Sequence, residues 1–571
     1  MGSFIIMDKR LFLALVLTAI VIIMTPLLFP GAKRPVVPVI PAVSDSSQHS
    51  PTATVTRSDS VATLVTGAPT ETASNTVPIL ITAPVETTIV NATRTTYAFS
   101  SNGAAPISVV LADYSSRRRD TGPHRVELVN PGSALARYHL AFDGDTIALD
   151  TVPLRAERGL VGNAPTLRFD GTVAGKALTF TYTFAPDSYL VHVVGMVANA
   201  PAGSVLLIDL PMTLRSNEPD SVDDQSHLAV SFRDTSGEVR STGFGKLEPS
   251  ETVIEPGPHS WVATRNKYFL VAYRAENSSF SGLRLQGLAR QGKTAANMAA
   301  RTSIPLGAEG SASFNIYAGP QSFRRLQRLG SNMDQVNPYG GFFQGAVQPF
   351  ATIVMRALLW MKDTTQLNYG WVLVLFGIII RLVLWPLNQS AMRTSIKMQR
   401  LQPELQAIQK KYSDDPKRQQ ETIMKVYKDH GMSPLSPLMG CLPMLLPMPI
   451  LFALYFVFQN TIEFRGVPFL WLPDISLKDP YYITPLLMGV SMFVMTWIGM
   501  RNSPPNPQAK MMLYMMPVMM TVLFLNFASG LNLYYAVQNI AALPQQWLLA
   551  RERMTAGSSA SDISSPVKQR T

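Results

Sequence analysis

Long apolar runs alternate with polar segments along this chain of 571 residues. An α-helix of about 20 apolar residues crosses the hydrocarbon core of a bilayer, which is about 30 Å thick. The runs have about this length, so we predict six transmembrane helices: one in an N-terminal anchor (residues 1–34) and five in a core (residues 366–550). The predicted spans are residues 11–29, 369–387, 438–460, 483–500, 511–527 and 531–549.

The first run differs from a cleaved signal peptide, which has a shorter apolar core. It follows Lys9 and Arg10, and residues 26–30 read Pro-Leu-Leu-Phe-Pro where a cleavage site has small residues. We therefore predict an uncleaved anchor. Residues 35–95 are rich in Ser, Thr, Pro, Ala and Val. They predict a flexible linker, because such a segment buries too little apolar surface to offset its ordering entropy.

Residues 96–320 show a period of two, in which apolar positions alternate with polar ones. This pattern is typical of strands with one buried face, and it predicts a large antiparallel all-β sandwich. The clearest alternation is formed by Leu178, Phe180, Tyr182 and Phe184. Turn signals are read at Asn102-Gly103, Asp143-Gly144 and Asp170-Gly171.

Two histidines of the β domain, His192 and His259, fall in or near predicted strands. Neither has a second ligand at metal-binding spacing, so we expect both to be structural side chains. Residues 321–365 have helical spacing in two stretches, and the second stretch (residues 342–362) has one apolar face with flanking basic residues. This pattern favours a helix that lies in the membrane interface before the second span. An ordinary core helix fits the same pattern, and the sequence leaves that alternative open.

Residues 388–436 form a polar segment between the second and third spans. Its apolar positions recur at helical spacing on both sides of Asp414-Asp415-Pro416, which supplies a turn, a cap and a first-turn proline. We predict two antiparallel helices in a basic hairpin. Because basic loops remain in the cytoplasm, the hairpin, both termini and the basic tail (residues 551–571) are predicted to be cytoplasmic, and the β domain external.

The net charge of +11 comes from basic residues that cluster beside the apolar runs. The cytoplasmic leaflet attracts such residues, so the charge does not call for a nucleic-acid partner. Cys441 is the one cysteine of the chain, which excludes an intrachain disulfide and a thiol metal cluster.

Arg381 is a full charge within the second predicted span. Such a charge costs about 2.5–3.5 kcal/mol on insertion scales, so it normally faces protein or water. The predicted spans in residues 438–460, 483–500 and 511–549 contain no Asp or Glu. A partner charge therefore has to come from water, lipid phosphate or a visiting chain. The alternative is that the side chain snorkels to the nearer end of its helix.

A polar stripe follows the last predicted span. Polar side chains in a spanning helix line water or meet polar groups of a neighbouring helix. With Arg381, the stripe indicates a hydrated groove, and interhelical hydrogen bonding is the alternative. Close to one face lie Asn532, Tyr535, Asn539 and Gln546, with Gln538 and Gln545 beside them.

Five segments make the chain similar to the YidC family of bacterial membrane protein insertases. They are GIIIRLVLWPL, MRTSIKMQRLQPELQAIQKKYSDD, MGCLPMLLPMPILFALYF, DPYYITPLLMGVSMF and FASGLNLYYAVQN, and the similarity covers about Phe342 to Arg553. The N-terminal part resembles the Gram-negative form with a large periplasmic domain, including SWVATRNKYFLVAY from Ser260.

The resemblance implies an α-helical polytopic protein of the bacterial inner membrane that inserts and folds membrane proteins, alone or with the Sec translocon. It implies as partners nascent membrane proteins, ribosome–nascent chain complexes, the Sec translocon and membrane lipids, with no catalytic residue, cofactor, metal or nucleic-acid sequence recognition. In the family, the position of Arg381 lies in a water-filled groove and attracts the polar, often acidic, external segment of a substrate. The stripe and the resemblance together give the expected groove residues: Arg381, Asn532, Tyr534, Tyr535, Gln538, Asn539 and Gln546.

Two other functions fit the sequence less well. A secondary transporter would need intramembrane acids or broken-helix repeats for ion coupling, and neither is evident. An intramembrane protease is weaker, because the segment Phe527–Gly530 lacks the first glycine of a GxSG motif and no histidine lies in a predicted span.

Overall fold

The computed structural model describes residues 85–563, apart from residues 119–121, 123, 143, 289, 292–293, 296, 338, 340–343, 414, 431–447 and 501–506. The chain divides into two compact units, Met1–Thr87 and Thr88–Thr571, and almost all described residues belong to the second. Several predicted segments lie outside the described residues: the anchor (1–34), most of the linker (35–95), residues 438–447 of the third span, and residues 564–571 of the tail.

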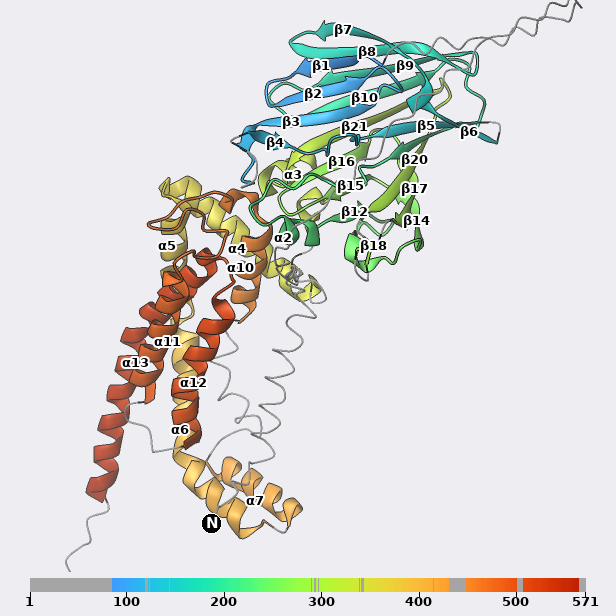
Figure 1. Ribbon diagram of the computed structural model, residues 1–571. Helices are drawn as coiled ribbons and strands as arrows, with labels where there is room; N and C mark the ends of the chain where they lie inside the picture. The colour runs from blue at the N-terminus through green and yellow to red at the C-terminus, as the bar shows by residue number, and fades with distance from the viewer. Residues whose placement is uncertain are drawn as a thin grey trace, which may run out of the picture. The chain divides into compact units, whose positions relative to one another are not determined.

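The largest sheet of the β domain has nine strands, all antiparallel (Figure 1). In spatial order they are β13 (Val239–Gly243), β12 (Ala229–Arg233), β15 (Trp261–Arg265), β16 (Phe269–Ala275), β21 (Ser311–Pro320), β10 (Leu190–Val197), β9 (Lys176–Phe184), β8 (Ala164–Val173) and β7 (Arg155–Val161).

Three smaller sheets complete the domain. The six-stranded sheet has the order β14 (Thr252–His259), β17 (Phe280–Gly287), β20 (Met298–Pro305), β11 (Val205–Asp209), β5 (Arg137–Phe142) and β6 (Asp145–Ala148). The four-stranded sheet has the order β1 (Thr87–Asn91), β2 (Thr95–Ser100), β3 (Pro106–Ser115) and β4 (Arg125–Glu127). A short hairpin pairs β18 (Arg290–Gln291) with β19 (Thr294–Ala295). Because β1 begins at Thr87, the first strand lies within the predicted linker.

The four-stranded and six-stranded sheets pack on the same face of the nine-stranded sheet. Along β9, the alternating residues from Leu178 to Phe184 are buried, as the period of two predicts. The ring of Tyr182 lies 4.7 Å from that of Phe99 in β2, and the ring of Phe180 lies 4.9 Å from that of Tyr138 in β5. One apolar core therefore joins the three sheets, and the domain is a β-sandwich.

One predicted turn is wrong. Asp170-Gly171 lies inside strand β8, where Asp170 pairs with Thr179 and Gly171 with Leu178 of β9. A Cβ atom on Gly171 would lie 2.3 Å from Leu154 Cδ2, so the glycine permits a close packing contact rather than a turn. By contrast, Gly103 and Gly144 have the positive φ angles, +68° and +84°, of turn residues.

Both singled-out histidines have structural partners. The Nδ1 atom of His192 lies 2.9 Å from Glu276 Oε2. His259 is buried, and its ring nitrogens contact the carbonyl oxygens of Arg233 and Glu255. Within the described part of the chain, no group of three or more His, Cys, Asp or Glu side chains forms a metal site.

Helical segments follow and interrupt the sheets. The 3-10 helices are η1 (Leu149–Thr151), η2 (Phe244–Lys246), η3 (Met333–Gln335) and η5 (Ile462–Phe464). The α-helices are α2 (Ser221–Ser226), α3 (Phe323–Leu329), α4 (Gln344–Thr365), α5 (Tyr369–Val383), α6 (Trp385–Lys411), α7 (Pro416–Asp429), α10 (Met448–Asn460), α11 (Ile483–Met500), α12 (Pro507–Phe524) and α13 (Ser529–Ile563).

The long helices match the predicted spans in place but differ at their ends. Helix α5 stops at Val383 rather than Leu387, because a turn at Leu384 precedes α6 with Pro386 in its first turn. Helix α12 is shifted towards the N-terminus and covers residues 507–524 instead of 511–527. Helix α13 continues through Pro544 far beyond the predicted span 531–549. Sequence hydropathy locates apolar stretches, but it does not predict such turns and extensions at the ends of the helices.

Within the described residues, α11 alone is both long and apolar enough to cross a membrane by itself. Residues 347–365 of α4 together with α5 are also long and apolar enough, but the two helices are bent by 116° relative to each other. The apolar segments Pro449–Asn460 and Leu513–Phe524 are shorter. The interfacial placement of α4 and a span at α5 stay predictions. The number of six spans stays a prediction.

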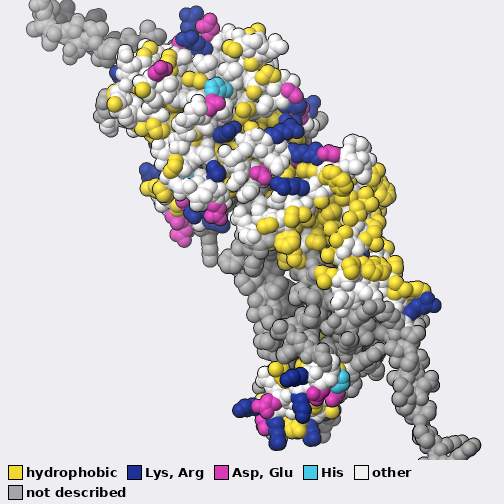
Figure 2. Space-filling model, turned by 180° about the vertical axis from the view of Figure 1, so that it is seen from behind, with side chains coloured by type: hydrophobic (Ala, Val, Ile, Leu, Met, Phe, Trp, Pro, Cys, Tyr) yellow, Lys and Arg dark blue, Asp and Glu magenta, His cyan; other side chains and the backbone are white. Residues whose placement is uncertain are grey.

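Helix α13 is central to the packing of the core: it contacts α5, α10 and α11, while α12 packs on α11 and α4 on α10. Figure 2 shows hydrophobic side chains gathered over the helical part of the molecule. Exposed apolar residues are present on several of these helices, among them Leu382, Val490, Val518 and Trp547. An apolar surface of this kind fits contact with lipid.

Two helices, α6 and α7, occupy the segment predicted as a hairpin. Leu401, Val426 and Tyr427 form a small buried cluster between them. Asp415 caps α7, since its side chain accepts a hydrogen bond from the backbone N–H of Arg418 and Pro416 follows at the first position. The hairpin starts at Trp385 instead of residue 388.

Candidate functional site

Arg381 lies in the last turn of α5 and points towards α13. Its Nη2 donates a hydrogen bond of 2.7 Å to Oε1 of Gln545. Its Nε is buried and has no hydrogen-bond partner among the residues that the structure describes. The guanidinium has five N–H donors, and a neutral amide does not balance its charge. The group therefore retains the capacity to bind an anion.

Gln545 is the direct partner of Arg381, and the sequence prediction does not include it in the groove. It is buried, and its Nε2 lies 3.2 Å from the carbonyl oxygen of Trp385 and 3.3 Å from Oε1 of Gln389. A signal for it was present: Gln545 follows Gln538 by seven residues, which is two turns of an α-helix.

Two more predicted groove residues lie at the contact between α5 and α13. Gln538 Nε2 donates to the carbonyl oxygen of Gly377 at 2.8 Å and to the hydroxyl oxygen of Tyr534 at 3.2 Å. The ring of Tyr534 packs beside Phe376, with ring centroids 6.0 Å apart. Arg381, Tyr534, Gln538 and Gln545 thus form one polar seam, which we call the α5–α13 seam.

The other predicted groove residues face different helices. Asn539 Nδ2 lies 3.2 Å from Ser491 Oγ of α11. Gln546 also faces α11, because a Cβ atom on Gly499 would lie 2.8 Å from its Oε1. Asn532 is buried and donates to the carbonyl oxygen of Phe524 at 3.1 Å, and the ring of Tyr535 packs against Phe524 of α12.

The predicted single stripe is therefore divided among three neighbours of α13. Interhelical hydrogen bonds, the alternative reading of the stripe, account for the amides of Asn532, Gln538 and Asn539. Arg381 differs from these residues, because its charge has no balancing partner in the seam.

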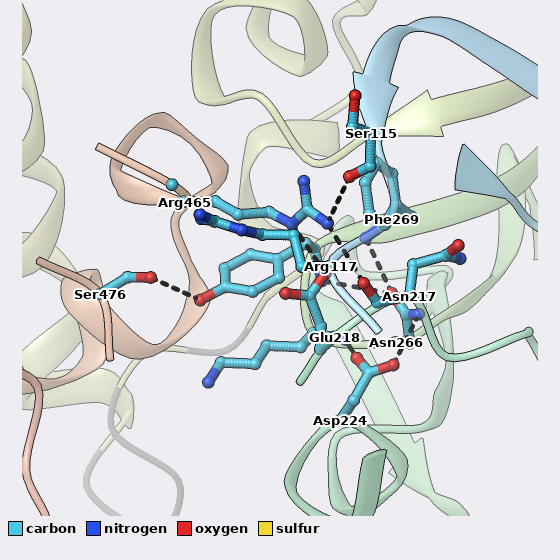
Figure 3. Close-up of polar contacts among 12 residues, drawn as sticks. Ser115, Arg117, Asn217, Glu218, Asp224, Asn266, Phe269, Arg465 and Ser476 are labelled. Atoms are coloured by element: carbon cyan, nitrogen blue, oxygen red, sulfur yellow. Dashed lines mark hydrogen bonds and ion pairs between the residues drawn. The ribbon is translucent and has the colours of Figure 1, made fainter. Parts of the chain in front are cut away.

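The loop between α10 and α11 makes polar contacts with the β domain (Figure 3). Arg465 Nε donates to Glu218 Oε1 at 2.7 Å, and its Nη2 donates to the carbonyl oxygen of Ser115 at 3.1 Å. The Arg465 guanidinium also lies 5.4 Å from the ring centroid of Phe269. The two side chains of the ion pair are only 6% and 7% exposed. Sequence reasoning missed this contact, because its partners are 247 residues apart.

Further contacts surround this ion pair and form what we call the β-domain junction. Arg117 pairs with Asp474 at 2.5 Å, and the hydroxyl of Tyr268 donates to Ser476 at 3.4 Å. Asp224 lies at the edge of the junction, where it accepts a hydrogen bond from Asn266 (Figure 3). Burial, with the neighbouring charge of Glu218, raises the pKa of Asp224 to about 7.

Helix α13 begins against the same loop. The backbone N–H of Ser529 donates to the carbonyl oxygen of Leu477 at 2.7 Å, and that of Gly530 donates to Ile475 at 2.9 Å. These bonds satisfy N–H groups that the first turn of a helix leaves without partners. The loop is thus fixed to the β domain on one side and to α13 on the other.

Comparison with known proteins identifies the two halves of the chain. Residues 360–556 match the family model described as 60Kd inner membrane protein. Residues 87–353 match the family model of the YidC periplasmic domain. A solved structure described as an active YidC insertase with its first transmembrane domain resolved has 19% sequence identity and a TM-score of 0.34, and the match covers 82% of this chain and 95% of that one.

Two curated relatives, both named membrane protein insertase YidC, match over most of their length. The protein of Chlorobaculum tepidum is 30% identical over 479 residues, which is 79% of each chain. The protein of Citrifermentans bemidjiense is 31% identical over 463 residues, which is 79% of this chain and 83% of the relative. Both halves and their order are shared, and the chain belongs to the YidC family of membrane protein insertases of the inner membrane, with a periplasmic domain.

Proposed function

We propose that the α5–α13 seam receives the polar segment of a client during insertion, and that Arg381 attracts the acidic groups of that segment. The observation that carries the proposal is the state of the guanidinium, which binds one neutral amide and has a buried Nε without a described partner. A client carboxylate supplies the missing acceptor and the missing counter-charge.

The local environment of the seam strengthens the attraction between Arg381 and a client carboxylate. A charge pair 4 Å apart is worth about 1 kcal/mol in bulk water and about 4 kcal/mol at an effective dielectric constant of 20. Apolar residues of α5 surround Arg381 in the sequence, so water screens its charge less than at an open surface. Attraction at this position lowers the cost of moving a short polar segment into the membrane, and the apolar part of the client then leaves sideways into lipid.

The β-domain junction supports the proposed topology. The loop between α10 and α11 contacts the β domain directly, so both lie on one side of the membrane. Since the β domain is periplasmic, this loop is periplasmic and the basic hairpin α6–α7 is cytoplasmic. Both chain termini then lie in the cytoplasm, in agreement with the positive-inside rule.

The hairpin is proposed to receive clients at the cytoplasmic mouth of the seam. Its buried cluster of Leu401, Val426 and Tyr427 pairs the two helices mainly with each other. Deletion of residues 388–436 should therefore block insertion while the spans still fold. Ribosome–nascent chain complexes supply the clients, and the protein inserts and folds them alone or with the Sec translocon.

The test compares four residues at position 381 with two matched clients, one with an acidic external tail and one with a basic tail. We expect Arg381→Ala to impair insertion of the acidic client and Arg381→Glu to impair it more. Arg381→Lys should keep part of the activity, because a point charge attracts but lacks the planar donor fork. The basic client should gain from Arg381→Glu. Insertion is measured by protease protection.

Arg356 of α4 provides the matched control, since it is an exposed arginine outside the seam. Arg356→Ala should leave the insertion of both clients unchanged. Equal insertion by all four residues at position 381, for both clients, would leave Arg381 a passive snorkelling side chain and refute the electrostatic mechanism.

A further inference from the structure

Four charged residues form a row across the outer face of the six-stranded sheet. The strand register places Arg137 of β5 opposite Asp209 of β11, Asp209 opposite Arg301 of β20, and Arg301 opposite Arg284 of β17 (Figure 1 labels β5, β20 and β17). All four side chains line one cleft of about 310 Å³. The row therefore brings three arginines and one aspartate to a single cleft.

The aspartate is already bound by its neighbours. Arg301 donates from Nε to Asp209 Oδ1 at 2.5 Å and from Nη2 to Oδ2 at 2.9 Å, and His139 Nε2 lies 2.8 Å from Oδ2. Burial acts in the opposite direction, but these hydrogen bonds lower the pKa of Asp209 below its ordinary value. Asp209 is thus ionised at neutral pH, and it holds Arg301 in a fixed orientation.

The other two arginines remain without such a partner. Arg137 and Arg284 are exposed, and neither forms a hydrogen bond or an ion pair within the described residues. Arg284 also lies directly opposite Arg301, and like charges in that position destabilise a sheet. One carboxylate does not balance three guanidinium groups, so the cleft has an excess of positive charge.

We propose that this cleft binds an oxyanion, a carboxylate or a phosphate, between Arg284 and Arg301. Neighbouring strands lie about 4.8 Å apart, which allows two guanidinium groups on adjacent strands to bind one such anion. Arg137 lies two strands from Arg301, or about 10 Å away along the row. At this distance it can bind a second acidic group of the same ligand.

The other residues that line the cleft, and its volume, limit which ligand fits. Leu210, Met212 and Ala134 give the cleft an apolar part beside the arginine row. A volume of about 310 Å³ is at the lower end of ligand sites. The site thus fits a small dianion or two acidic side chains of a peptide. It belongs to the β domain and does not depend on the proposed role of Arg381.

The experiment titrates the full chain in detergent micelles by isothermal titration calorimetry. The probes are inorganic phosphate, a hexapeptide of alternating Asp and Ser, and the same hexapeptide with Asn in place of Asp. The variants are Arg284→Gln and Arg137→Gln. The matched control is Arg158→Gln, which removes an exposed arginine of β7 outside the cleft.

We expect an oxyanion probe to bind the wild type, and Arg284→Gln to weaken that binding about tenfold, as for a lost charge-assisted hydrogen bond. Arg137→Gln should weaken the Asp peptide more than phosphate, and Arg158→Gln should have no effect. Binding of the Asp peptide that phosphate does not displace identifies an acidic peptide as the ligand, and preferred binding of phosphate identifies the free anion. Binding of neither anion, equal binding of the Asn peptide, or insensitivity to Arg284→Gln overturns the proposal.

Discussion

The buried ion pair at the β-domain junction allows a quantitative prediction. Arg465→Ala leaves Glu218 buried without its charge partner, and removal of one member of a buried pair costs about 3–5 kcal/mol. Burial already raises the pKa of Glu218, opposed by Arg465. At pH 8 the lone carboxyl group must stay charged or take up a proton, and both are unfavourable. Because protonation of Glu218 limits the loss of stability, we expect a loss at the lower end of this range, about 3 kcal/mol.

Hydrogen–deuterium exchange of residues 461–482 in detergent micelles measures this effect. If the loop opens locally, a loss of about 3 kcal/mol raises the exchange rate of its amides about 100-fold, since 1.36 kcal/mol is a factor of ten. The backbone N–H of Gly466 is a suitable reporter, because it donates to Asp474 at 2.9 Å. The double variant Arg465→Gln with Glu218→Gln removes both charges, and it should recover most of the protection.

Arg168→Ala is the matched control. It breaks the exposed pair Arg168–Asp170, whose side chains are 56% and 38% exposed, and such pairs are worth about 0–1 kcal/mol. We expect no change in the exchange of residues 461–482 from this variant. If Arg465→Ala leaves the loop as protected as in the wild type, the junction does not hold the loop and the reasoning from burial is refuted.

Three further predictions follow from other described residues. Because the folded-state pKa of Asp224 is about 7 and its ordinary value is 3.8, stability should fall as pH rises from about 4 to 7, by an amount on the order of 4 kcal/mol. Asp224→Asn should remove that part of the fall in unfolding experiments at pH 5 and pH 8, and an unchanged pH dependence would contradict the assignment. Gly530→Ala should lower the thermal unfolding temperature, because its Cβ would lie 2.5 Å from the ring of a buried phenylalanine of α10, whereas Gly345→Ala has open space and should not. An equal effect of the two glycine variants would exclude that packing argument. In a chain whose own cysteine is replaced by serine, Lys478→Cys should react with an impermeant thiol reagent added outside spheroplasts and Ser413→Cys should not, and the reverse pattern would overturn the topology.

Local patterns allowed much of the architecture to be predicted. The alternation in β9, the apolar cluster of the hairpin and the cap at Asp415 depend on residues close in sequence, and the structure has all three. Asp170-Gly171 shows the limit of such patterns, because a contact with a distant leucine decides the role of the glycine.

The candidate site was predicted less completely than the fold. An unbalanced charge in an apolar run is visible in sequence, so Arg381 could be named. Which side of α13 each amide faces depends on how α5, α11 and α12 surround it, and that arrangement is tertiary. The sequence pattern therefore merged three separate contacts into one stripe. It placed Gln545 beside that stripe but did not mark it as a groove residue or as the partner of Arg381.

The length of α13 connects distant parts of the molecule mechanically. A continuous helix of 35 residues is about 52 Å long. A bilayer with its headgroups is about 40–45 Å thick, so in the proposed topology a helix of this length extends beyond the surface opposite to the loop where it begins. A force applied at the C-terminal end of α13 would therefore be transmitted along the helix to the hydrogen bonds at Leu477 and Ile475, and through that loop to the ion pair with the β domain.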